Sequence, residues 1–137
     1  MKDFYSATPI NAIDNHEYTF AVVLNKKHRV YDGHFPQHPV VPGVCMILMI
    51  RELVEKAVGG NLMFAGISNI KFLSLVDPAM NHELSIRLTI DPIEAGGYNI
   101  KASIEFAGKV FLSLKGSLSA IITCADASAI DNERLEN

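Results

Sequence analysis

The stretch that decides the fold is VCMILMIRELVEKAV, residues 44–58. It contains no Gly, Pro, Asn or Asp, and its many Met, Leu, Glu, Lys and Arg residues favour a helix of about four turns. A Pro-Gly pair at 42–43 opens this helix and a Gly-Gly pair at 59–60 closes it. Because residues 44–50 are apolar on every side, we expect most of the helix surface to be buried.

Three later stretches alternate apolar and polar residues, at 82–90, 98–106 and 110–118. A period of two residues is typical of strands with one buried face. The short breaks between them contain Gly, Pro and Asp, so the three strands are predicted to form an antiparallel meander. Less regular patterns at 18–24 and 64–76 predict two further strands. Wrapping this curved sheet around the single helix gives an α+β layer fold.

Length and composition indicate one globular domain. We place it at residues 1–124, followed by a polar acidic tail at 125–137. A hydrophobic share of 49% and a charged share of 20% exclude an intrinsically disordered chain. The chain has 12 Lys and Arg against 15 Asp and Glu, and the excess acids lie in the tail. The body is therefore neutral, which argues against nucleic acid binding, because that affinity depends on clustered basic residues.

The sequence also suggests a compartment. The longest apolar run, residues 44–50, is far shorter than the roughly 20 residues that cross a bilayer as a helix. Two cysteines, Cys45 and Cys124, are too few for a disulfide framework, and neither has a Cys or His at metal-ligand spacing. We therefore expect a cytoplasmic protein without metal or cofactor, and we interpret Cys45 as a buried, inert thiol.

The segment before the helix, DGHFPQHPVVPGV at residues 32–44, has the composition of a functional loop. Its three prolines and two glycines stiffen the backbone, and a stiff backbone positions a site well. The helix start at Gly43 offers unpaired N–H groups to a carbonyl oxygen that becomes negative. His34 supplies a base with an ordinary pKa of about 6.5. Together these groups suit removal of a proton α to a thioester carbonyl.

These residues resemble a known family. The string GHFPxHPVVPGV, the apolar helix after it, and the segments FAGI at 64–67 and IKF at 70–72 are similar to the bacterial 3-hydroxyacyl-acyl carrier protein dehydratases. The resemblance runs from about residue 8 to residue 122. It implies a hotdog fold, and a homodimer or trimer of dimers with active sites at the subunit interface. The implied reaction eliminates water from a (3R)-hydroxyacyl thioester of acyl carrier protein, giving a trans-2-enoyl thioester.

The resemblance also assigns residues. By it, His34 matches the catalytic histidine and the Gly43 amide matches the donor that polarises the thioester carbonyl. The remaining residues that we expect at the oxyanion and substrate-binding site are Phe35, Pro42, Val44 and Leu48.

One departure from the family pattern bears on the catalytic pair. The family pairs its histidine with a carboxylate fourteen positions further on, contributed by the opposite subunit, and here that residue is Leu48. Loss of a general acid costs about 10² to 10⁴ in rate. Glu52, one turn later and roughly 6 Å away on the same helix face, is the candidate substitute.

Three functions therefore stay open. The first is a working dehydratase that uses His34, Gly43 and an acid from Glu52, another residue or water. The second is a non-catalytic acyl-thioester binding homologue that has lost the acid. The third is a hotdog thioesterase, which would need Glu52 to activate water. In each case we expect the acyl group as a thioester of an acyl carrier protein of fatty acid, lipid or pigment synthesis, or of coenzyme A.

Overall fold

The computed structural model describes residues 3–12, 16–32 and 40–121. They form one antiparallel sheet, one long helix and a short 3-10 helix, η1. The strands follow the spatial order β1-β2-β4-β5-β6-β3, so β1 and β3 are the edges. In chain order the elements are β1 (Tyr5–Ala12), β2 (Glu17–Leu24), η1 (Arg29–Tyr31), α1 (Gly43–Val58), β3 (Leu62–Phe72), β4 (Glu83–Pro92), β5 (Tyr98–Phe106) and β6 (Lys109–Ala120).

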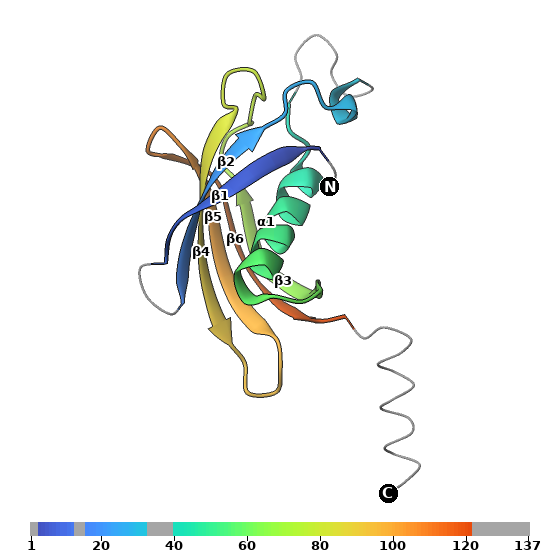
Figure 1. The fold of residues 1–137 in the computed structure, drawn as a ribbon, viewed down its shortest axis with the longest axis vertical. Coiled ribbons are helices and arrows are strands. Elements are labelled where there is room, and N and C mark those ends of the chain that lie inside the picture. Colours follow the sequence, from blue (N-terminus) through green and yellow to red (C-terminus); the bar gives the residue numbers. More distant parts are fainter. Residues whose placement is uncertain (1–2, 13–15, 33–39, 122–137) are drawn as a thin grey trace, which may run out of the picture.

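Helix α1 lies against the curved sheet, as Figure 1 shows. One side of the helix carries the side chains that are fully buried in the core, namely Met49, Ile50, Leu53 and Val54. They pack with the inward residues of β4, which alternate between buried and accessible along the strand. This arrangement confirms the predicted α+β fold of a helix wrapped by an antiparallel sheet.

The predicted meander is also confirmed, because β4 pairs with β5 and β5 with β6, both antiparallel. Two sequence expectations need correction. The predicted strand at 64–76 begins at Leu62 and ends at Phe72, where the backbone leaves the ladder and the N–H groups of Leu73 and Ser74 both donate to the Phe111 carbonyl. The first strand, β1, was not predicted, because its sequence YSATPINA is short of large apolar residues.

The helix is less covered than its sequence predicts. Val44 is 62% exposed, and Ile47 and Leu48 are only half-buried, so one apolar side of the first two turns stays open. The expectation that most of the helix surface is buried is therefore wrong for a single chain. The open side runs along the helix at i, i+3 and i+4 spacing, which is one continuous face.

The hairpin between β4 and β5 contains a glycine that the fold requires. Gly97 has φ +89°, and a Cβ placed there would lie 2.3 Å from the Leu118 carbonyl oxygen. Its neighbour Gly96 also has positive φ, at +103°, but faces open space.

We therefore expect Gly97→Ala to destabilise the protein much more than Gly96→Ala. Backbone strain alone costs about 1–2 kcal/mol at either position. The backbone clash at Gly97 adds about 1–3 kcal/mol. Urea denaturation of the two variants measures the difference in free energy of unfolding. Equal losses would show that the close approach to Leu118 does not exist in solution.

Candidate functional site

The start of α1 offers backbone donors. Pro42, in an extended conformation, caps the helix without a side-chain hydrogen bond, and its carbonyl accepts from the Cys45 and Met46 N–H groups at 3.0 and 3.2 Å. The N–H groups of Gly43 and Val44 have no acceptor among the described residues. They lie at the positive end of the helix dipole, where a carbonyl oxygen that gains negative charge is stabilised.

Phe72, the last residue of β3, packs directly on this helix start. A Cβ on Gly43 would come within 2.9 Å of the Phe72 ring, so the glycine permits the close contact. The ring remains 53% exposed. The segment before the helix is fixed by a second contact, in which the Val41 N–H donates to the Val76 carbonyl at 2.8 Å. Phe72 was quoted in the family resemblance, but nothing in the sequence placed it beside Gly43.

His34 and Phe35 lie outside the described residues, so their expected roles stay predictions. Of the other expected site residues, Pro42, Gly43 and Val44 share the helix start. Leu48 lies on the half-open apolar side of α1, one turn beyond Val44.

Glu52, the candidate substitute acid, is already engaged within its own chain. The Tyr5 hydroxyl of β1 donates a hydrogen bond of 2.9 Å to Glu52 Oε1, and the pair is partly buried. Burial, and then the hydrogen bond to the Glu52 carboxylate, raise the pKa of Tyr5 well above its ordinary value of 10.0. Sequence reasoning missed this contact because the two residues are 47 positions apart. If Glu52 acts as the acid, the same carboxylate must also accept the hydrogen bond from Tyr5.

The structure agrees with the interpretation of Cys45 as a buried, inert thiol. It is 3% exposed in the first turn of α1, and burial raises the pKa of its thiol. A buried thiol with a raised pKa is a poor nucleophile, because the thiolate is the reactive form. Tyr31 in η1 is also buried, and burial raises its pKa to about 12.

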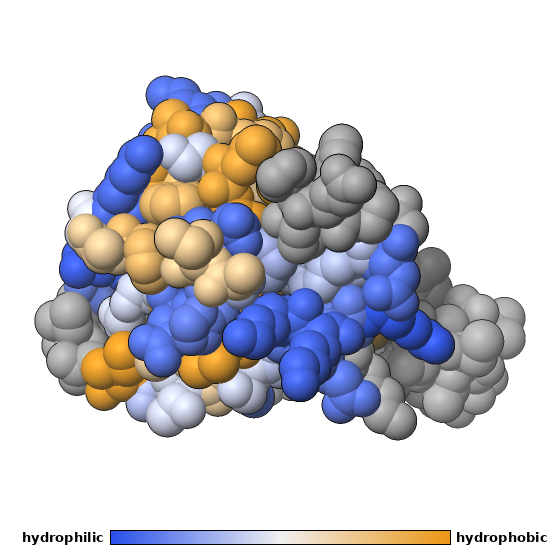
Figure 2. Space-filling view, turned by 90° about the horizontal axis from the view of Figure 1, so that it is seen from above, coloured by the Kyte–Doolittle hydropathy of each residue, from blue (hydrophilic) through white to orange (hydrophobic). Residues whose placement is uncertain are grey.

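Apolar side chains are exposed around the end of the molecule where α1 begins. Figure 2 shows this end from above, with orange apolar residues gathered beside a strongly hydrophilic region. The first turn of α1 and the segment 72–80 contribute the exposed large apolar residues Val44, Phe72, Leu73, Leu75 and Met80. Exposed apolar patches of this kind mark binding surfaces in soluble proteins.

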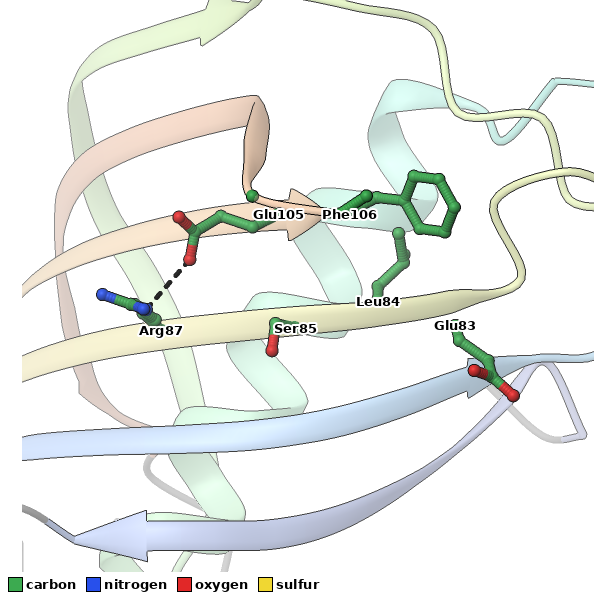
Figure 3. A pocket seen from close by; sticks show the side chains of 8 residues that line it. Glu83, Leu84, Ser85, Arg87, Glu105 and Phe106 are labelled. Atoms are coloured by element: carbon green, nitrogen blue, oxygen red, sulfur yellow. Dashed lines mark ion pairs between the residues drawn. The ribbon is translucent and has the colours of Figure 1, made fainter.

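A separate pocket of about 310 Å³ lies at the ends of β4 and β5 and contains none of the expected site residues. Figure 3 shows Arg87 and Glu105 facing each other across it, joined by an ion pair of 2.9 Å. The charges of Arg87 and Glu105 therefore neutralise each other, and Glu83 is the remaining charged residue of the lining. Within the described ranges, no three His, Cys, Asp or Glu residues group as metal ligands, and no helix there has the length and hydropathy to cross a membrane.

Comparisons with known proteins agree with the fold and the motif. A family model described as ApeI-like, ApeI dehydratase, matches residues 10–109. The 3-hydroxyacyl-[acyl-carrier-protein] dehydratase FabZ of Burkholderia mallei (strain SAVP1) is 32% identical over 108 residues, which cover 72% of this chain and 67% of that protein.

Solved structures with the same fold include a dehydratase complex and a thioesterase. The dehydratase heterocomplex ApeI:P from Xenorhabdus doucetiae matches with a TM-score of 0.60 at 20% identity, over 83% of this chain and 98% of that chain. A putative thioesterase from Ralstonia eutropha matches with a TM-score of 0.56 at 15% identity, over 82% and 83%. At these identities the structural matches support the fold alone.

The contact between Tyr5 and Glu52 predicts an alkaline loss of stability. Above pH 10 the tyrosines of the unfolded chain lose their protons, while Tyr5 in the folded chain keeps its own. The contribution of Tyr5 to the free energy of unfolding is therefore complete below pH 10 and decreases as the pH rises above 10. Tyr31 adds to the fall between pH 10 and about 12. Urea denaturation from pH 8 to 11 should show a shallower fall for Tyr5→Phe than for the wild type. An identical pH dependence in the variant would contradict the raised pKa of Tyr5.

Proposed function

Because the chain belongs to the ApeI-like dehydratase family, we propose that it acts on 3-hydroxyacyl thioesters of acyl carrier protein and eliminates water to give trans-2-enoyl thioesters. The observation that carries this proposal is the start of α1. Two backbone N–H groups without acceptors among the described residues, together with an apolar surround, fit an activated thioester carbonyl.

The proposed chemistry divides between two groups of this chain. The Gly43 N–H donates to the thioester oxygen as negative charge develops there, and this lowers the barrier to removal of the α-proton. His34 takes that proton. The electron pair of the broken C–H bond forms the double bond, the bond from carbon to the 3-hydroxyl breaks, and the hydroxyl leaves as water after gaining a proton.

The source of that last proton separates the two leading functions. Position 48 offers no acid, and the Glu52 carboxylate already accepts from Tyr5. If neither Glu52 nor another group protonates the leaving hydroxyl, the chain keeps the thioester site without rapid elimination. A non-catalytic acyl-thioester binding homologue is therefore the second candidate. No observation favours the third, a thioesterase, since its water-activating base would also be Glu52.

We propose that the protein works as a homodimer joined through β3. This strand is a sheet edge with no partner on its outer side among the described residues, and it exposes Met63, Ile67 and Phe72. Unpaired apolar edges favour association with another chain. A dimer here places a second chain near the open side of α1. A protein of the same fold, ApeI, forms the dehydratase heterocomplex ApeI:P, so a different second chain is the alternative partner.

The activity test compares three proteins on a 3-hydroxyacyl-acyl carrier protein. His34→Ala should lose about 10² to 10⁴ in kcat/KM, because it removes the base. Leu48→Glu should gain a similar factor, because it restores an acid to a half-buried position that tolerates a polar side chain.

The outcomes separate the candidates. A wild type that binds the thioester without turnover, combined with an active Leu48→Glu, supports the binding homologue. If neither protein turns over or binds the thioester, the proposed substrate class is wrong.

The dimer test uses light scattering. The wild type should have twice the chain mass of 15.0 kDa. Ile67→Lys should shift the equilibrium toward the monomer, because it places a charge on the exposed edge strand. The matched control, Val23→Lys, alters an exposed apolar residue of β2, away from that edge, and should remain a dimer. A monomeric wild type would contradict the assembly.

A further inference from the structure

A second pocket lies at the opposite end of α1 from the candidate thioester site. Its volume is about 520 Å³, within the range of small-molecule sites. Gly43 and Lys56 are separated by about 20 Å along the helix, at roughly 1.5 Å of rise per residue. The pocket is therefore distant from the helix start. It is lined by Pro9 and Ile10 of β1, Tyr18, Thr19 and Phe20 of β2, and Lys56 and Ala57 of α1.

The walls of this pocket are mainly apolar. Phe20 is 3% exposed, while Ile10 is 59% exposed although it is a large aliphatic residue. A bulge explains Ile10: Pro9 pairs with Phe20 and Asn11 with Thr19, so Ile10 has no partner in the ladder. Bulges re-aim side chains and are frequent next to binding sites.

One positively charged side chain lines this apolar pocket. Lys56 is the charged residue among its lining side chains, and it forms no ion pair or hydrogen bond among the described residues. The nearby acids of α1 have other partners, since Glu52 accepts from the Tyr5 hydroxyl and Glu55 accepts from the Leu62 N–H at 2.8 Å. An ammonium group beside an apolar wall is complementary to an anion with an apolar chain.

We propose that this pocket binds a medium-length aliphatic carboxylate, a class that includes free fatty acids. The carboxylate pairs with the Lys56 ammonium, and the chain packs against Ile10, Phe20 and Ala57. Tyr18 also lines the pocket. The site is separate from the chemistry proposed for the helix start, so it is a place where a free acid can bind while a thioester occupies the other end of α1.

The test is calorimetric titration of the full chain with decanoate, with decanol as the uncharged comparison. The wild type should bind decanoate more tightly than decanol. Lys56→Glu should weaken decanoate binding by at least about fivefold, because it replaces one exposed attraction with repulsion. Lys101→Glu, the matched charge reversal on β5, should leave the affinity unchanged, since Lys101 lines none of the pockets described above.

A second variant tests the apolar part of the site. Ala57→Leu keeps a good helix former and fills the pocket, so it should reduce binding of decanoate and decanol alike. Decanoate bound at the start of α1 would be insensitive to both Lys56→Glu and Ala57→Leu, and this result would overturn the proposal, as would a wild type that binds no decanoate. Because the titration uses no thioester, an inactive dehydratase still gives a decisive answer.

Discussion

The structure depends on the burial of one face of α1 against the curved sheet. Met49, Ile50, Leu53 and Val54 have no measurable exposure, and each fully buried aliphatic side chain contributes about 1.5–3 kcal/mol. This packing fixes the rotation of the helix about its axis. It turns Tyr5 and Glu52 toward each other, places Gly43 beneath Phe72 and leaves Val44 and Leu48 on the open side.

The same packing gives the two ends of α1 different chemistry. Its start presents N–H donors among apolar residues, which suits a polarised carbonyl. Its last turn presents Lys56 beside an apolar pocket, which suits a carboxylate. Between them, position 48 is leucine where the family resemblance leads to a carboxylate, and the Glu52 carboxylate accepts from the Tyr5 hydroxyl.

The parts predictable from sequence are those set by local patterns. The caps and composition of α1 placed its start within one residue, and the alternation in β4, β5 and β6 reflects one buried face. The contacts of Phe72 with Gly43 and of Tyr5 with Glu52 join residues far apart in the chain, so no local sequence pattern predicts them. Strand β1 was missed because an edge strand needs few large apolar residues.

The proposed function requires that the start of α1 polarises a thioester carbonyl. Isotope-edited infrared spectroscopy of a crotonyl thioester, labelled at that carbonyl and bound to the protein, measures this polarisation directly. Hydrogen bonds from the helix start should lower the carbonyl stretching frequency below its value in water. A bound thioester whose carbonyl stretches at the same or a higher frequency than in water would show that the helix start does not polarise it.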